Sequence, residues 1–511
     1  MIKVKYYLLV TILFIITLVA VMPANCYAQV DPAGTKTGTI KDVPAAKPGE
    51  PSISEIADAV GHNKISINFV WTLITGFLVM FMQAGFALVE TGFTRAKNVA
   101  HTMGMNFLVY ALGIVGFYVC GFALMFGGVG AVAALGGTPG LSNEVAITLF
   151  GKNFGLFGTN GFFLNGGVYD VGVFSLFLFQ LVFMDTTATI PTGAMAERWK
   201  FVSFMFYGLF ISGIVYPIFG NWVWGGGWLS QLGANFGLGH GHVDFAGSSV
   251  VHLVGGIAAL AGAIVIGPRI GKYNKNGTSN AIPGHNIPMA ITGTFILAFG
   301  WFGFNPGSTL AGTDLRISVV AVNTMLASGS GALFATLYMM WKFKKPDPSM
   351  MANGMLAGLV AITAPCAFVN AISAFIIGAI SGVLVVVAVF FIDQKLKIDD
   401  PVGAIAVHGV NGAWGVLSLG LFADGTYGDG WNGVAGTVKG LFYGDASQFV
   451  AELIGVITCF AFVFAVMYAF FKIQDKFFGG IRVSAKDEIA GLDMPEMGVQ
   501  GYEELNIRPS E

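Results

Sequence analysis

Charged residues and cysteines are both scarce in this 511-residue chain. Charged side chains make up 11% of it and hydrophobic ones 55%, whereas a soluble domain carries about 25% charge, so an ordinary soluble protein is excluded. A net charge of −2 offers no basic surface for a nucleic-acid partner. Beyond Cys26, the cysteines at Cys120, Cys366 and Cys459 each lie in an apolar stretch, which is neither a disulfide framework nor a metal-binding spacing. We therefore expect no nucleic-acid partner, no metal and no cofactor.

The N-terminus has the pattern of an export signal. Two lysines precede an apolar stretch (Leu8–Val21), and Cys26–Ala28 supplies a small–x–small cleavage site. We predict that residues 1–28 are a cleaved signal peptide, with an uncleaved anchor as the alternative. Residues 29–67 are polar and rich in Pro, Gly and Ala, and we predict that they form a loosely ordered exported N-terminal arm.

Long apolar stretches fill most of the remaining chain. Each has the roughly 18–25 residues that a helix needs to cross about 30 Å of hydrocarbon, although Pro365 interrupts the eighth. The fold class is therefore an all-α polytopic membrane protein with eleven transmembrane helices, a membrane domain over residues 68–472 and a tail over 473–511. The predicted spans are Asn68–Glu90, Gly104–Phe126, Val171–Ala194, Phe201–Trp224, Ala246–Gly267, Ile287–Phe304, Ile317–Trp341, Met351–Val369, Ala371–Ile392, Val402–Phe422 and Phe449–Phe471.

Basic residues in the loops predict the orientation. Lysines and arginines concentrate in cytoplasmic loops of membrane proteins, and here they concentrate in one set of alternate loops. We expect an inner (plasma) membrane location with the N-terminus outside and the C-terminal tail in the cytoplasm. The rich set holds Arg95, Lys97, Arg198, Lys200, Arg269, Lys272, Lys275, Lys342, Lys344, Lys345, Lys395 and Lys397; the poor set holds Lys152, Arg316 and Lys439.

Two histidines lie inside predicted spans. His252 is early in the fifth span and His408 early in the tenth. A histidine within a span is costly and usually faces the bundle interior or a pathway, although a structural hydrogen bond to a neighbouring helix is the plainer alternative. Matching positions in the fifth and tenth spans favour two five-helix inverted-repeat halves plus a final helix, with a binding site at the interface between the halves.

Several spaced motifs carry a family resemblance. The fifth span opens with D-F-A-G-S-S-V-V-H (Asp244–His252), and the sixth ends in W-F-G-F-N-P-G-S (Trp301–Ser308). The fourth ends in W-V-W-G-G-G (Trp222–Gly227), G-A-M-A-E-R closes the third, and the tenth contains V-H-G-V. Together these motifs resemble the ammonium transporter (Amt/Mep/Rh) family, specifically its Amt branch, from about Asn68 to Tyr502.

The resemblance implies a set of site residues. It assigns an outer ammonium site to Trp224 and Ser308, which fits the chemistry, because an indole face attracts cations and a hydroxyl oxygen accepts an N–H bond. An interfacial belt position is the alternative for Trp224. Phe183 and Phe304 match the stacked pair that closes the pore beneath that site.

The resemblance also places His252 and His408 as paired imidazoles that line the narrow pore. Asp244 matches the carboxylate near the outer site, and its position just before a helix predicts a capping role. Asp185, in the third span, lies about 200° around the helix from Phe183, so a pore-facing Phe183 would turn Asp185 toward another helix or subunit.

The function that the resemblance implies is ammonium transport. Ammonium would be recruited outside, deprotonated near the phenylalanine gate and conducted as ammonia along the imidazoles, with net proton co-transfer left open. The alternatives are an ammonium sensor and a neutral ammonia gas channel; an intramembrane metalloenzyme lacks a third ligand, and we expect no enzymatic activity. The family also implies transport of methylammonium, a homotrimer and a P-II signalling protein at the cytoplasmic face, although Met497 and Val499 depart from the tail pattern of many relatives.

The other histidines lie outside the predicted spans or near their ends. We expect His101 and His285, at the cytoplasmic face, and His62, in the arm, to be solvated. His240 and His242 lie in an outer loop, which we expect to be a plain polar loop, with a metal site as the alternative.

Overall fold

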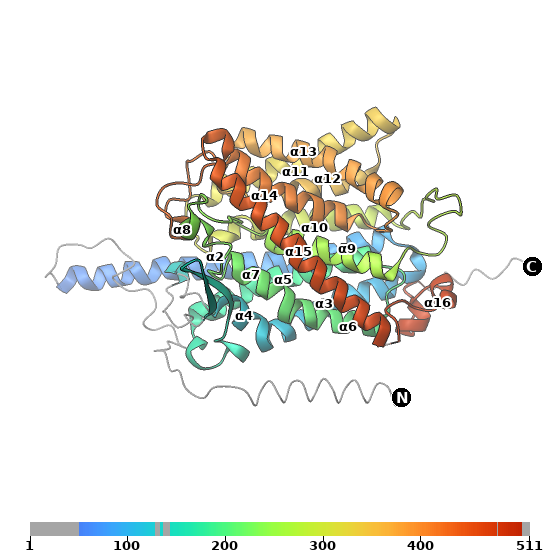
Figure 1. Ribbon diagram of the computed structural model, residues 1–511, viewed down its shortest axis with the longest axis horizontal. Helices are drawn as coiled ribbons and strands as arrows, with labels where there is room; N and C mark the ends of the chain where they lie inside the picture. The colour runs from blue at the N-terminus through green and yellow to red at the C-terminus, as the bar shows by residue number, and fades with distance from the viewer. Residues whose placement is uncertain (1–50, 128–132, 136–143, 478, 503–511) are drawn as a thin grey trace, which may run out of the picture.

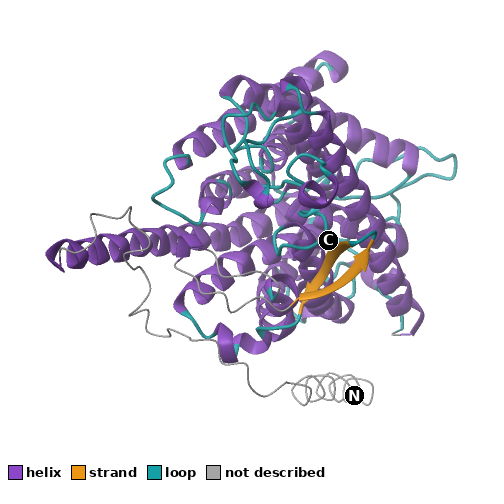
Figure 2. Ribbon diagram, turned by 60° about the vertical axis from the view of Figure 1, so that its left-hand side comes forward, coloured by secondary structure: helices purple, strands orange, loops and turns teal. Residues whose placement is uncertain are grey.

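The fold is a bundle of long helices with one small β-hairpin (Figures 1 and 2). The predicted signal peptide, the first part of the predicted arm and the end of the tail lie outside the described residues. The computed structural model describes residues 51–127, 133–135, 144–477 and 479–502.

Within those residues, ten helices are long and apolar enough to cross a membrane, several of them with a π-helical or 3₁₀ turn inside the span. The prediction of a polytopic, mostly helical membrane domain is therefore confirmed, whereas the β-hairpin described below was not predicted. The span-forming helices are α2 (Pro51–Phe93), α3 (Val99–Gly116) with α4 (Phe122–Phe126), α5 (Val171–Ala194), α6 (Phe201–Phe210) with α7 (Tyr216–Val223), α9 (Val254–Ile266), α10 (Ile287–Phe304), α11 (Ile317–Phe343), α13 (Ala371–Phe391), α14 (Asn411–Phe422) and α15 (Ala446–Phe477).

The predicted eighth span is shorter than expected. Helix α12 (Pro348–Ile362) has 15 residues instead of the predicted Met351–Val369. The helix gives way to turns at Thr363 because a proline disfavours helical geometry in the residue before it, and Pro365 follows two positions later. Most of α12 is buried between α11 and α13, so neighbouring helices cover it.

The first helix begins earlier than predicted. Residues 51–67, predicted to be a loosely ordered arm, are the first four to five turns of α2. Pro51 is compatible with a first helical turn, where no N–H partner is needed, and no later proline interrupts the helix. This part of α2 projects beyond the bundle in both views (Figures 1 and 2).

A β-hairpin separates α4 from α5. Strands β1 (Glu144–Leu149) and β2 (Lys152–Gly158) pair antiparallel with a register shift between Val145 and Ala146. The hairpin is held against the end of α7, because Trp222 Nε1 donates to the Leu156 carbonyl at 2.8 Å. The hairpin and α8 (Leu232–Phe236) lie at one end of the bundle, here called the hairpin face, and α16 (Ala485–Ala490) lies at the other, the tail face (Figure 1).

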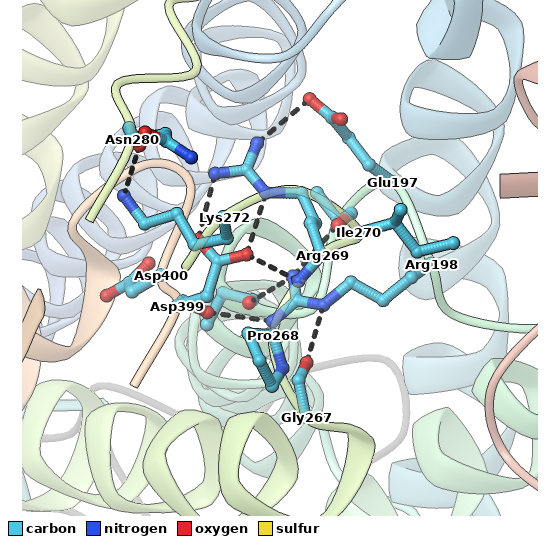
Figure 3. Close-up of polar contacts among 12 residues, drawn as sticks. Glu197, Arg198, Gly267, Pro268, Arg269, Ile270, Lys272, Asn280, Asp399 and Asp400 are labelled. Carbon is cyan, nitrogen blue, oxygen red and sulfur yellow. Dashed lines mark hydrogen bonds and ion pairs between the residues drawn. The ribbon is translucent and has the colours of Figure 1, made fainter. Parts of the chain in front are cut away.

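A buried charge network joins the loops of the tail face (Figure 3). The Arg269 guanidinium donates to both carboxylate oxygens of Asp399, at 2.8 and 2.9 Å, and lies 3.1 Å from Glu197. Burial alone would raise the pKa of Asp399, but the hydrogen bonds and charges of Arg269 and Arg198 lower it well below its ordinary range. The network therefore connects the segments that follow α5 and α9 to the one that precedes the predicted tenth span.

The tail packs on this same face. Asp493 Oδ1 accepts from the His101 backbone N at 3.0 Å, and Glu496 Oε2 accepts from the Phe201 N at 2.8 Å. Tyr502 contacts His285 Nε2 at 3.0 Å. The prediction that His101 is solvated is wrong, because its side chain is fully buried in this region, while His285 is half-buried.

Candidate functional site

Four elements meet around a cavity at the hairpin-face end of the bundle. The cavity has a volume of about 190 Å³, and its lining includes Phe183 from α5, Trp224 at the end of α7, Asp244 in the following loop and Ser308 in η9 (Pro306–Thr309). These residues were predicted to form the outer site and gate. The structure brings them to one cavity although they are up to 125 residues apart in the sequence.

Hydrogen bonds orient the two predicted cation ligands. Trp224 Nε1 donates to the Asp244 carbonyl at 2.6 Å, which holds the indole while its faces stay free of that bond. Ser308 Oγ donates to the Phe304 carbonyl at 2.8 Å, so the lone pairs of the hydroxyl are left to accept. As expected, α10 ends at Phe304, and the turn at Pro306 places Ser308 on the cavity.

Asp244 caps the helix that carries His252. One carboxylate oxygen accepts from the backbone N–H groups of Gly247 and Ser248, at 2.8 and 2.9 Å. The other accepts from Ser249 N and Oγ, both at 2.7 Å, and from Val250 N at 3.0 Å. The capping prediction is thus confirmed in its geometry, and the carboxylate also supplies negative charge beside the cavity.

A pair of phenylalanine rings lies directly beneath the cavity. Phe183 and Phe304 stack with centroids 3.9 Å apart and planes inclined by 23°. Both side chains are buried, and Trp224 meets Phe183 edge-on at 6.1 Å. The stacked, buried rings therefore lie between the cavity and the histidine His252, which stacks on Phe304.

The two predicted histidines contact each other below the phenylalanine pair. His252 Nδ1 and His408 Nδ1 are 3.1 Å apart, so one donates and the other accepts. His252 also stacks on Phe304 at 5.5 Å, and its Nε2 has no partner among the described residues. Ring and hydrogen-bond contacts therefore run from Trp224 through Phe183 and Phe304 to the two imidazoles.

Unusual backbone geometry brings the imidazoles together. Both lie in π-helical turns, η8 (Ser248–Leu253) and η11 (Ile405–Val410), which precede α9 and α14. The turns pack crosswise, η8 against α14 and η11 against α9. A Cβ on Gly256 would collide with the backbone of Gly409, so glycine permits this close approach.

Comparisons with known proteins identify the family of this chain. The model of the Ammonium Transporter Family matches residues 70–502. The chain belongs to the ammonium transporter family. Ammonium transporter Amt2 of Archaeoglobus fulgidus is 46% identical over 441 residues, covering 86% of this chain and 89% of that one. Ammonium transporter Amt1 of Haloferax mediterranei is 37% identical over 460 residues, covering 86% and 80%.

Solved structures of ammonium transporter relatives share the fold. A structure described as a Sensor Amt Protein superposes with a TM-score of 0.73 at 37% identity, covering 85% of this chain and 99% of that one. Mep2 of Candida albicans superposes with a TM-score of 0.69 at 27% identity, covering 83% and 87%. The prediction of the Amt branch is confirmed, and the chain is a multi-pass membrane protein.

His242 has surroundings in this ammonium transporter that the sequence analysis missed. Its Nδ1 lies 2.7 Å from the Glu452 carboxylate and its Nε2 2.9 Å from Ser249 Oγ, and all three are buried. Burial alone would lower the pKa of His242, but the charge and hydrogen bond of Glu452 raise it above its ordinary value. The expectation of a plain polar loop is wrong for this residue, and within the described ranges no group of three metal-ligating side chains is present.

Two carboxylates lie within the spans. Asp185 is buried and turns toward α3, where its Oδ1 would be 3.6 Å from a Cβ on Gly113, so its predicted direction away from the pore is confirmed. Glu90, near the end of α2, was not singled out from the sequence. Its position, an ionisable residue at the end of an apolar segment, could have indicated a functional role from the sequence.

Proposed function

We propose that this chain transports ammonium: it binds the ion at Trp224 and Ser308, deprotonates it at the phenylalanine gate and conducts ammonia past His252 and His408. The observation that carries the proposal is the 3.1 Å contact between the imidazoles immediately beneath the stacked gate. The cavity, the phenylalanine pair and the imidazoles each have the chemistry that one of these steps requires.

The outer cavity suits a small cation. The Trp224 face attracts a cation by about 0.5–2 kcal/mol, and the Ser308 oxygen accepts one N–H bond. The buried carboxylate of Asp244 adds negative potential beside the cavity without occupying it, because its oxygens are engaged with the helix it caps. Together they favour ammonium over a neutral molecule of the same size.

The gate favours loss of the proton. Passage between buried rings removes the hydration of a cation, which costs several kcal/mol even after relaxation. Ammonia carries no net charge and avoids most of that cost, so deprotonation at the Phe183–Phe304 pair lowers the barrier. We propose that the proton follows along the imidazoles, because a shared Nδ1–Nδ1 hydrogen bond allows one ring to donate as the other accepts.

Currents from reconstituted protein test the proposal. An inward ammonium gradient should produce a transient current in the parent, and His252→Ala or His408→Ala should suppress the current without loss of the assembled protein. Substrate uptake measured on the same vesicles separates neutral ammonia flux from charge movement. Wild-type currents with unchanged ion selectivity in both variants would show that the histidines are structural.

A sensor function is the second candidate, since one solved relative is described as a Sensor Amt Protein. Sensing requires ammonium binding but not useful flux. Binding at the outer cavity together with no measurable uptake or current in reconstituted vesicles would favour the sensor over the transporter.

We also propose the assembly, topology and partners that the sequence analysis predicts. Residues 1–28 are a signal peptide, 29–67 an exported arm, 68–472 the membrane domain and 473–511 a cytoplasmic tail, in an inner-membrane homotrimer. Packing of the tail against His101 and Phe201 supports a composite face for a P-II-type protein. Native mass spectrometry tests the trimer, reporter fusions after Lys345 and Lys152 test the topology, and co-purification tests the partner.

A further inference from the structure

A second, much smaller cavity lies on the tail side of the imidazole pair. It has a volume of about 20 Å³, and its polar lining is His408, Glu90 and Asn353, with apolar side chains completing the wall. A water molecule needs roughly 10–15 Å³ of such volume, so the cavity has room for one molecule of the size of water or ammonia. Glu90 therefore shares a site with the last imidazole of the pore.

The Glu90 carboxylate has neutral partners only. Its Oε2 accepts from Asn106 Nδ2 at 2.7 Å, and Thr192 Oγ lies 2.9 and 2.8 Å from the two carboxylate oxygens. In the part of the chain that the structure describes, no Lys, Arg or His nitrogen forms an ion pair with Glu90, whose residue is 3% exposed. A buried carboxylate without a counter-ion readily takes up a proton.

The hydrogen bonds accommodate both protonation states of Glu90. Thr192 has one hydroxyl hydrogen and two acceptors within reach, the Glu90 carboxylate and the Thr189 carbonyl at 2.5 Å. When Thr192 donates to the carboxylate, Glu90 is charged and satisfied. When Thr192 donates to Thr189, its oxygen accepts the hydrogen of a protonated Glu90. The proton can therefore enter and leave while the heavy atoms keep their positions.

We propose that Glu90 is the proton carrier at the tail-side end of the pore, receiving the proton relayed by the imidazoles and returning it to ammonia. This proposal rests on the transport function proposed above. An imidazolium N–H bond breaks and a Glu90 O–H bond forms, through the molecule held in the cavity. The O–H bond then breaks as the ammonia lone pair forms a fourth N–H bond, which leaves ammonium and a carboxylate.

The titratable side chains that surround Glu90 affect how readily its carboxylate takes up a proton. Asp400, which precedes η11, is the nearby carboxylate whose charge acts on Glu90, and His408 faces it across the cavity. Tyr207 on α6 is buried and donates its hydroxyl to the Ala188 carbonyl at 2.8 Å. A negative Asp400 repels a negative Glu90, which favours uptake of the relayed proton.

Full-length protein in proteoliposomes tests the proposal through current, substrate uptake and the solvent deuterium isotope effect. Glu90→Gln keeps an acceptor for Asn106 but carries no proton, so the current should fall on the order of 100-fold, the typical contribution of a positioned proton-transfer group. Glu90→Asp should keep part of the current with a larger isotope effect, because its carboxylate is further from the cavity. Asp185→Asn, which neutralises another buried carboxylate, is the matched control and should behave like the parent.

Each outcome decides the question. Parent-like currents in Glu90→Gln, with intact uptake in the parent, would overturn the role of Glu90 and leave the transport function standing. A parent without ammonium uptake would instead refute the transport function itself, and a parent with uptake but no current would refute the proton relay and Glu90 together. If Glu90→Gln does not assemble, an unchanged isotope effect in Glu90→Asp overturns the proposal.

Discussion

Replacing Asp244 by asparagine tests how much its carboxylate stabilises the start of the helix that carries His252. The substitution preserves shape and one acceptor oxygen, which keeps the bonds from Gly247 and Ser248. The new amide NH₂ faces the three donors that the second oxygen served, which are two backbone N–H groups and the Ser249 hydroxyl. The hydroxyl can rotate to accept, but the two N–H groups lose their partner.

The magnitude follows from these two bonds. A hydrogen bond to a charged group contributes about 1.5–3 kcal/mol, so the free energy of unfolding should fall by roughly 3–6 kcal/mol. The loss should lie toward the lower end of that range, because Asp244 adjoins a cavity that admits water. Ammonium affinity should weaken as well, since the negative charge beside the Trp224 face is lost.

Asp400 supplies the matched control. Its carboxylate caps the other histidine-bearing segment, accepting from Gly403 N at 3.0 Å and Ile405 N at 2.7 Å. Asp400→Asn therefore loses one charge-assisted bond and should cost about 1.5–3 kcal/mol. Denaturant titration in detergent measures both variants, and isothermal binding measures the affinity of Asp244→Asn. A larger loss in Asp400→Asn than in Asp244→Asn, or an unaltered Asp244→Asn, would refute this account of the caps.

Three further results are expected. Trp224→Leu removes the cation–π face and should weaken apparent ammonium affinity by about 0.5–2 kcal/mol, roughly 2- to 30-fold, in uptake assays; unchanged affinity would place recruitment elsewhere. Because the pKa of His242 is raised when folded, its pairing with Glu452 should stabilise the protein fully below about pH 6.5. This stabilisation should decrease as pH rises through the folded pKa. Unfolding measured at several pH values should show this dependence in the parent and a flatter one in Glu452→Gln. Because the pKa of Asp399 is lowered when folded, its contribution is present above about pH 4 and is lost in stronger acid. Asp399→Asn should cost about 3 kcal/mol at neutral pH, because the buried Arg269 loses one of its two carboxylate partners and keeps only Glu197. A neutral result in denaturant titration would contradict this.

Patterns along the chain predicted the membrane domain because span length and hydropathy are local properties. The same patterns failed for α12, where Pro365 ends the helix inside a continuous apolar run, and for residues 51–67, where a polar composition did not prevent a helix. Their positions in predicted spans placed His252 and His408 inside the membrane domain but gave no information on their contact, which depends on crosswise packing of two π-turns.

The surroundings of two residues were missed from the sequence for the same reason. His242 and Glu90 depend on partners far along the chain, Glu452 and Thr192, and only the fold brings such partners together. Motif matching assigned Trp224, Ser308, Phe183 and Phe304 to one region because those residues lie in recognisable strings, and the structure brings them together. A buried carboxylate near the end of a span, such as Glu90, belongs to no recognisable motif. An ionisable residue in an apolar segment is therefore a reason to consider a functional role even without a motif.

The two π-turns make the length of the chain around each histidine as important as the histidine itself. A π-turn holds one residue more than an α-turn, and each residue advances a helix by about 100°. Deleting a single residue within η8 would restore an α-helical turn and swing the ring of His252 away from His408 by about that angle. A survey of related genomes that checks only for both histidines would therefore overlook the loss of the imidazole contact in such a shortened sequence. Spacing across each turn is the better criterion for deciding which relatives have kept the contact between the two imidazoles.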